Sequence, residues 1–231
     1  MMQKTVETPV TVVAIGDVHG CADLLEQALA PHLGSGAELI FLGDLIDRAP
    51  QAGGDRRVIE RVRQLQQNPT AHGLAAVTVL RGNHEQLLLD ALEEDTPGEA
   101  TELWERNGGD PAFLPMAREH RSWLEALPLT AIRGTYLFVH AGVRPGVPLA
   151  EQRCDDLLWI RGPFLRQGHH GLPYTVVHGH TFRSDYSITR LPHRIGIDTG
   201  AFRSGRLTAF PLLINSWEKS ISCDPADQKR Y

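Results

Sequence analysis

The sequence has few cysteines, no long apolar run and no excess of positive charge, and each absence excludes a class of protein. Its cysteines, Cys21, Cys154 and Cys223, are widely separated and form no CxxC pair, which excludes a disulfide framework and favours a reducing compartment. Neither a signal-peptide core nor an apolar run of membrane-spanning length is present, so we expect a cytoplasmic protein without a membrane segment. A net charge of −5 argues against a nucleic-acid partner.

No feature of the sequence divides the chain. We find no linker rich in proline, glycine or serine, and no internal repeat. A length of 231 residues is sufficient for one substantial core. We therefore expect a single domain over residues 1–231, with a core over about 10–214 and a polar tail over 216–231. The sequence leaves the oligomeric state open.

The first half of the chain alternates between strand and helix patterns. Apolar runs at 10–15, 38–42 and 74–80 predict buried strands. Each run is followed by a segment with helical spacing, and these segments occupy 23–30, 56–67 and 84–94. Three strand–loop–helix units in series are typical of a parallel sheet with helices on its faces.

The pattern changes after the third unit. Residues 97–128 predict short helices and loops, which we call the cap, and we interpret Trp104, Phe113 and Trp123 as its apolar core. The second half of the chain is predicted to be rich in strands, at 135–139, 174–178, 194–197 and 206–214. We expect these strands to pair antiparallel.

A polar motif follows almost every predicted strand. The motifs are GDVHG (16–20), GDLIDR (43–48), RGNHE (81–85), VHAG (139–142) and HGHT (178–181). Ligand sites of open α/β sheets lie just beyond the carboxyl ends of the strands. Three neighbouring strand ends would therefore bring the first three motifs into one crevice.

Together the motifs supply the donors of a two-metal site. The candidate ligands are carboxylates, imidazoles and one amide, namely Asp17, His19, Asp44, Asn83, His140 and His180. Such a mixed nitrogen and oxygen set suits Mn, Fe or Zn rather than calcium. Each motif alone is typical of a turn or a helix cap. Their combination in order, each after a strand, indicates a metal pair that clamps oxygens in a displacement reaction.

The series GDVHG, GDLIDR, RGNHE, HAG and GHT resembles the PPP-family metallophosphatases. This calcineurin-like group holds the serine/threonine protein phosphatases and their bacterial and phage relatives. The resemblance covers about residues 10–210. It implies an α/β (α+β) fold in which a central β-sandwich is flanked by helices in four layers, with a di-metal site at the sheet edge.

The resemblance also implies a role for each site residue. Asp17, His19 and Asp44 would hold one metal, and the second would be held by four ligands: Asp44, Asn83, His140 and His180. His84 would be the general acid, oriented by Asp47. Three arginines would bind phosphate oxygens, namely Arg48, Arg81 and Arg161. The cofactors would be two divalent ions, Mn first, with Fe, Zn, Ni or Co as alternatives, and a hydroxide activated by them would attack phosphorus directly.

The expected function is therefore metal-dependent hydrolysis of phosphomonoesters, with phosphoserine or phosphothreonine in proteins as substrate and phosphotyrosine as a further one. HAG and Ala49 resemble the bacterial members. The rival is a symmetrical dinucleoside-tetraphosphate hydrolase, which by resemblance lacks the dyad aspartate, reads GNHD and has tryptophan after GH. This chain has Asp47, Glu85 and Thr181 instead. Phosphodiesterase activity and a non-catalytic, phosphoprotein-binding role are further alternatives.

The remaining polar residues receive smaller assignments. His178 is expected either behind the metal ligands or packed in a strand, and Asp198 at a strand end. We expect His169 and His170 to form a solvated surface pair, and the sequence assigns them no chemical role.

Overall fold

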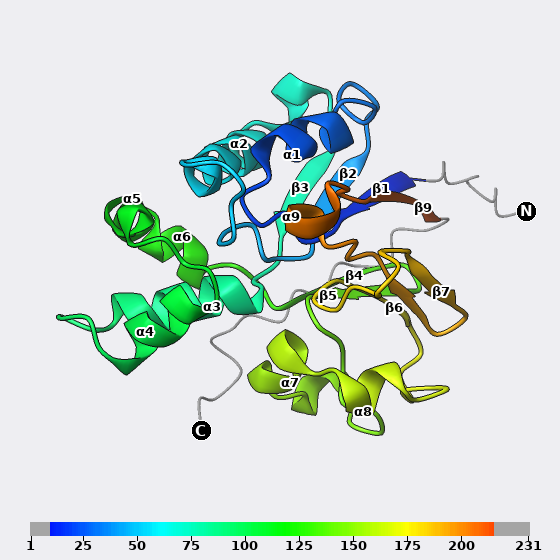
Figure 1. Cartoon of the computed structure of the whole chain (residues 1–231). Coiled ribbons are helices and arrows are strands. Elements are labelled where there is room, and N and C mark those ends of the chain that lie inside the picture. Colours follow the sequence, from blue (N-terminus) through cyan, green and yellow to red (C-terminus); the bar gives the residue numbers. More distant parts are fainter. Residues whose placement is uncertain (1–9, 215–231) are drawn as a thin grey trace, which may run out of the picture.

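Two β-sheets packed face to face and flanked by helices make up the described part of the chain, residues 10–214 of a computed structural model (Figure 1). This arrangement confirms the predicted fold class. The polar tail predicted for 216–231 and Cys223 lie outside the described residues.

The first sheet has the strand order β3-β2-β1-β9. Its strands are β1 (Val10–Ile15), β2 (Glu38–Phe41), β3 (Ala76–Val79) and β9 (Ala209–Ile214). The first three pair in parallel, as the sequence predicts, and β9 runs antiparallel to β1.

The second sheet has the order β4-β5-β6-β8-β7. Its strands are β4 (Thr130–Arg133), β5 (Tyr136–Val139), β6 (Thr175–His178), β7 (Thr189–Leu191) and β8 (Arg194–Gly196). The expectation of an antiparallel second half is wrong at its centre, because β5, β6 and β8 pair in parallel. Helices between β5 and β6 provide the crossover that parallel pairing requires. The edge strands β4 and β7, which pair antiparallel, were not predicted.

The helices lie mainly on the outer faces of the two sheets. They are α1 (Ala22–Leu29), α2 (Gly54–Gln67), α3 (Asn83–Leu92), α4 (Glu99–Arg106), α5 (Leu114–Glu119), α6 (Arg121–Glu125), α7 (Cys154–Trp159), α8 (Gly162–Leu165) and α9 (Ala201–Ser204). Short 3₁₀ turns occupy Pro69–His72, Pro111–Phe113 and Leu149–Glu151. Figure 1 shows α1 and α2 outside the first sheet, α7 and α8 outside the second, and α3 to α6 together at one side. None of the helices within residues 10–214 is long and apolar enough to cross a bilayer.

Alternation along β1 divides its side chains between two apolar layers. Val13 and Ile15 pack with the residues of α1 and α2, whereas Val12 and Ala14 pack between the sheets. A third layer lies between the second sheet and α7 and α8. Because both faces of each sheet are covered, the strands are held rigidly, and the loops at their carboxyl ends start from fixed positions.

Candidate metal centre and active site

The four ligands predicted for one metal converge on the ring of His140. Its Nε2 atom lies 2.9 Å from Oδ1 of Asn83, 3.2 Å from Nδ1 of His180 and 3.4 Å from Oδ1 of Asp44. Asp44, His140 and His180 also form a buried group whose ligand atoms all lie within 4.8 Å of one another. Donors from four separate loops at the strand ends therefore meet around one point.

The three ligands predicted for the other metal are less closely grouped. His19 and Asp44 group with His84, and Nε2 of His19 lies 3.6 Å from Oδ2 of Asp44. Asp17 is in neither compact group, and its carboxylate accepts a hydrogen bond from the backbone N–H of His180 at 3.0 Å. It remains buried beside Asp44, whose charge acts on it.

Two of the candidate ligand histidines, His19 and His140, present unprotonated nitrogens to this cluster. Nδ1 of His19 donates to the carbonyl of Ile46 at 3.0 Å, and Nδ1 of His140 donates to the carbonyl of Leu42 at 2.9 Å. These bonds place the lone pair of each ring on Nε2, the atom that faces Asp44. Burial also lowers the pKa of His19 to about 3. Neutral imidazoles oriented in this way fit a divalent cation.

The carboxylates of the site leave negative charge to be balanced. Burial, followed by the charges of Asp198 and Asp44, raises the pKa of Asp17 well above its usual value. Two of the ligand imidazoles supply no compensating charge, since burial lowers the pKa of His19 to about 3 and that of His180 to about 2. A buried site with clustered carboxylates, neutral imidazoles and an amide oxygen matches the chemistry of a divalent-metal pair.

The site also concentrates unusual backbone conformations. Six non-glycine residues of the described chain have positive φ, and five of them are predicted site residues: His19, Asp44, Asp47, Arg48 and His180. Each such residue costs about 1–3 kcal/mol and persists only where its surroundings impose it. The backbone is therefore held in strained turns that aim these side chains at one point.

His84 and Asp47 form the predicted dyad. Nδ1 of His84 lies 2.6 Å from Oδ2 of Asp47, and both side chains are buried. Nε2 of the same ring lies 3.9 Å from Oδ2 of Asp44, on the side of the ligand cluster. Burial opposes protonation of His84, but Asp44 and Asp47 outweigh it and raise the pKa of this imidazole. The ring is thus suited to hold a proton at Nε2.

Two residues that support the site were not identified from the sequence. Trp104, interpreted as part of the cap core, donates from Nε1 to Oδ1 of Asp47 at 2.9 Å. Glu85 accepts hydrogen bonds from the backbone N–H groups of Asp44, Leu45 and Gly82, at 2.8–2.9 Å. Its carboxylate therefore joins the loop after β2 to the loop after β3. The motif RGNHE carries Glu85, but only its place in a helix N-terminus was predictable.

The three predicted phosphate-binding arginines differ in position. Nη1 of Arg48 lies 3.0 Å from Nε2 of His19, and Nε of Arg161 donates to Nε2 of His180 at 3.1 Å. Both guanidinium groups thus border the ligand cluster. Arg81 is buried, and its guanidinium donates to Oε1 of Gln86 and contacts the carbonyl of Glu125 in α6. These contacts connect it to α3 and the cap, and its phosphate role stays a prediction.

A half-buried aromatic surface lies beside the cluster. The ring of Phe202 meets that of His19 edge to face at 5.0 Å, and Arg48 lies over it at 5.1 Å. Phe182 and Tyr186 stack at 5.6 Å and continue the surface, together with the exposed Arg203. The sequence offered no periodic signal for this surface, because Phe182 and Tyr186 come from an irregular loop and Phe202 and Arg203 from α9, a helix of only four residues.

The other histidines lie away from the ligands. His178 is a packed strand residue that contacts the ring of Phe164 and the guanidinium of Arg194. The expectation of a solvated His169–His170 pair is wrong for His170. That ring is buried, and both of its nitrogens are satisfied within the protein: Nε2 donates to the carbonyl of His193 and Nδ1 accepts from the backbone N–H of Leu172.

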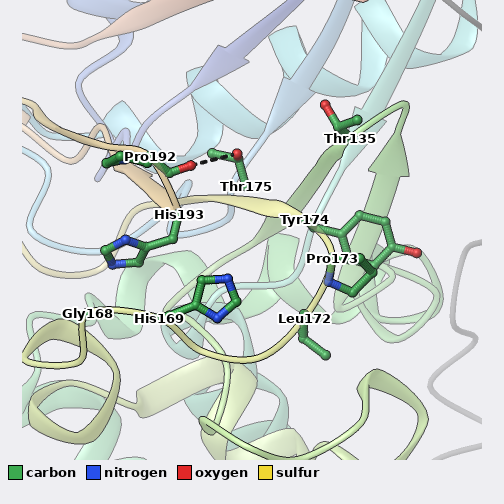
Figure 2. Close-up of a pocket in the computed structure, with 9 residues that line it drawn as sticks. All are labelled: Thr135, Gly168, His169, Leu172, Pro173, Tyr174, Thr175, Pro192 and His193. Atoms are coloured by element: carbon green, nitrogen blue, oxygen red, sulfur yellow. Dashed lines mark hydrogen bonds between the residues drawn. The ribbon is translucent and has the colours of Figure 1, made fainter.

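A hollow of about 540 Å³ lies beside His169 and His193 (Figure 2). Its lining includes the ring of His169, exposed Pro173 and Thr175 at the first residue of β6. The candidate ligands His140 and His180 follow the last residues of β5 and β6, so this hollow lies at the opposite end of the sheet and is separate from the candidate ligand cluster.

Comparison with known proteins agrees with this geometry. Residues 10–195 match the calcineurin-like phosphoesterase family. The chain is 29% identical over 214 residues to serine/threonine-protein phosphatase 1 of Salmonella typhimurium strain LT2, covering 84% of this chain and 88% of that protein. It is 36% identical over 145 residues to a symmetrical bis(5'-nucleosyl)-tetraphosphatase of Janthinobacterium sp. strain Marseille, covering 58% of this chain and 44% of that protein.

A solved structure shares the fold. A protein serine/threonine phosphatase from Saccharomyces cerevisiae superposes with a TM-score of 0.57 at 16% identity, covering 94% of this chain and 82% of that one. The family match spans most of the sequence and includes all five of the polar motifs. This chain belongs to the calcineurin-like phosphoesterases.

Proposed function

We propose that this chain is a metal-dependent phosphomonoesterase that acts on phosphoserine and phosphothreonine in proteins, with phosphotyrosine as a further substrate. The observation that carries the proposal is the buried His84–Asp47 dyad beside the ligand cluster. A serine alkoxide is a poor leaving group unless it is protonated, whereas a nucleotide leaving group bears a stable negative charge. A dedicated acid is therefore most useful for a phosphomonoester of an alcohol.

Three groups of residues would bind the metals, bind the phosphate and supply the proton. Asp17, His19, Asp44, Asn83, His140 and His180 would hold two divalent ions, with Mn²⁺ as the proposed metal. When bound, the ions neutralise phosphate charge and lower the pKa of water. Arg48 and Arg161, which border the cluster, would bind phosphate oxygens. His84 would hold a proton at Nε2 for the leaving oxygen, with Asp47 fixing the ring through Nδ1.

The relatives include both a protein phosphatase and tetraphosphatases, and the extent of the match supports the first. The similarity to the Salmonella protein phosphatase extends over 88% of that protein, whereas the similarity to the tetraphosphatase covers 44% of its length. The separated cysteines support a reducing, cytoplasmic setting for such an enzyme.

A second candidate, hydrolysis of dinucleoside tetraphosphates, is favoured by the aromatic surface. Phe182, Tyr186 and Phe202 lie near Arg48 and Arg203, and such a surface suits stacking of a nucleobase beside a polyphosphate. Cleavage of a phosphoanhydride would not need the His84–Asp47 dyad. Loss of Asp47 should therefore slow a phosphomonoesterase but not a tetraphosphate hydrolase.

A substrate panel separates the candidates. Chelator-treated protein given two equivalents of Mn²⁺ is assayed on a phosphoserine peptide, a phosphotyrosine peptide, diadenosine tetraphosphate and a phosphate bis-ester. We expect the phosphoserine peptide to give the highest kcat/KM, and Asp47→Asn to lower it about 100-fold with little change in tetraphosphate cleavage. Preference for the tetraphosphate, with no effect of Asp47→Asn, would establish the second candidate instead.

A further inference from the structure

Helix α4 and the turn after it contact two adjacent residues of the active site. Trp104 in α4 donates its indole N–H to Oδ1 of Asp47 at 2.9 Å, while Oδ2 of the same carboxylate faces Nδ1 of His84. Trp104 is fully buried, as is Asp47. The carboxylate is therefore held from both sides, by an indole that cannot accept a proton and by the imidazole that it orients.

The turn Asn107–Gly109 holds the next residue in the same way. The backbone N–H of Arg48 donates to the carbonyl of Gly108 at 2.9 Å, and Nε of Arg48 donates to the carbonyl of Asn107 at 3.1 Å. Gly108 has φ of 106°, and a Cβ there would collide with the side chain of Arg48. A Cβ at Gly109 would likewise collide with the indole of Trp104. Close approach of this turn to the site thus requires both glycines.

The backbone that this turn contacts is itself strained. Asp47 and Arg48 both have positive φ, of 68° and 60°, in the loop after β2. Consecutive residues of this kind require external contacts to keep their conformation. The cap supplies those contacts from residues about 60 positions further along the chain.

We propose that α4 and the turn Asn107–Gly109 form a positioning element for the reaction, in which Trp104 fixes the Asp47 carboxylate behind the general acid and the turn fixes Arg48. This inference rests on the proposed function for its catalytic consequence, but the hydrogen-bond geometry it describes exists independently of the substrate. Trp104 is a positioning residue, since it acts on the reaction only through Asp47 and His84.

The test compares two cap tryptophans. Trp104→Phe removes the indole N–H that contacts Asp47. Trp123→Phe removes an equivalent hydrogen bond, from Nε1 to Oε1 of Gln66 at 2.7 Å, without contact to the dyad. Each variant is first checked for cooperative thermal unfolding and for metal content. Because Trp104 is fully buried, Gly109→Ala serves as a second variant that keeps every hydrogen-bonding group and only displaces the indole.

The first readout is the dependence on leaving group. With phenyl phosphate, whose leaving oxygen needs a proton, we expect Trp104→Phe to lower kcat about 10- to 100-fold. With 2,4-dinitrophenyl phosphate, whose leaving group needs none, kcat should change less than about 3-fold. Gly109→Ala should show the same dependence on leaving group more weakly, and Trp123→Phe should leave kcat unchanged on both substrates. An equal loss on both substrates would overturn the proposal, because it would indicate general damage to the site.

The second readout does not require activity. The proton between Nδ1 of His84 and Asp47 should give a strongly downfield proton NMR resonance, assigned by its absence from His84→Asn. We expect this resonance to shift in Trp104→Phe and to stay in place in Trp123→Phe. An unshifted resonance in Trp104→Phe would overturn the proposal even in an active enzyme. A shifted resonance in a protein without phosphomonoesterase activity would support the positioning element while refuting the proposed function.

Discussion

The two ends of the β-sandwich both bury charged side chains, but they treat them differently. At the carboxyl ends of the parallel strands, Asp17 and Asp44 are buried beside His19 and His180, two imidazoles whose pKa values burial lowers. At the other end, Glu38 opens β2 and is fully buried. Its carboxylate accepts hydrogen bonds from Nε and Nη2 of Arg133, at 2.8 and 2.5 Å, and from Oγ1 of Thr78, at 3.2 Å.

The difference lies in whether the chain itself balances the charge. The Glu38–Arg133 pair connects β2 of the first sheet with β4 of the second, and the guanidinium matches the carboxylate through two hydrogen bonds. At the site, by contrast, burial and neighbouring carboxylates raise the pKa of Asp17 well above its usual value. A buried charge with its own partner serves the fold, whereas clustered carboxylates whose balance must come from outside indicate a binding site.

The largest expected effect comes from Asp44, the carboxylate common to both ligand groups. Asp44→Asn should lower kcat/KM on the best substrate by at least about 1000-fold, equivalent to about 4 kcal/mol. Elemental analysis should show fewer than two metals bound per chain. In chelator, the free energy of unfolding near neutral pH should be lower than that of the wild type, because the neighbouring histidines, led by His140, outweigh burial and lower the pKa of Asp44, and its Oδ1 accepts a hydrogen bond from the backbone N–H of His84.

The matched control for this variant is Asp156→Asn, which changes a buried acid of α7 that is paired with Arg144. It should keep both metals and full activity. Retention of two metals and of activity by Asp44→Asn would show that the site end is not the metal centre and would remove the contrast between the two ends.

At the other end, Arg133→Met should act on stability and not on metals. It leaves Glu38 buried without its ionic partner, so urea unfolding should show a loss of about 3 kcal/mol. Metal content and KM should stay unchanged. The double variant Glu38→Met with Arg133→Met should recover much of the loss, because an apolar pair needs no desolvation. Metal loss in Arg133→Met would show that the two ends are coupled.

The part of the site that could be predicted from sequence is the part carried by strand ends. Runs such as VTVVAI specify buried strands, and each is followed at once by its polar motif. Parallel pairing then places the loops after β1, β2 and β3 at one edge. For this reason Asp44 and Asn83 meet as expected, although they come from two different strand ends, whereas His140 follows β5 of the second sheet and reaches them through the packing of the two sheets.

Contacts that depend on docking of a distant segment could not be predicted. Trp104 reaches Asp47 across 57 residues, and Glu85 reaches Asp44 across 41. Local periodicity specifies that α4 and α3 are helices, but not which loop their side chains meet. Arg81 shows the same limit, since its position after β3 does not determine that its guanidinium extends to Gln86 and α6.

Strand direction in the second half was missed for a related reason. The crossover between β5 and β6 uses α7 and α8, which have only six and four residues. Segments this short do not show a helical period, so the connection was not recognised as one that permits parallel pairing.

The smallest expected effect tests the same contrast on the surface, where a carboxylate is balanced by backbone groups. Glu94 accepts hydrogen bonds from the N–H groups of Gly98, Ala100 and Thr101 and from Oγ1 of Thr101, at the N-terminus of α4. These bonds, led by that from the Thr101 hydroxyl, lower the pKa of Glu94 from 4.5 to about 2.

Because the folded state lowers this pKa, the charged carboxylate stabilises the protein above pH 4.5, and the contribution is lost as pH falls from 4.5 toward 2. The melting temperature of Glu94→Gln should therefore lie below that of the wild type near neutral pH, and the gap should narrow across this window. Glu102→Gln, which removes an exposed charge paired with Arg106 from the same helix, controls for net charge. A gap that stays constant with pH would mean that Glu94 acts through its shape and not its charge. Trp104 lies in α4, the helix whose N-terminus Glu94 caps. If the difference in melting temperature narrows at low pH while the metal content stays unchanged, the stability of α4 depends on the charge of Glu94 but metal binding at the site does not.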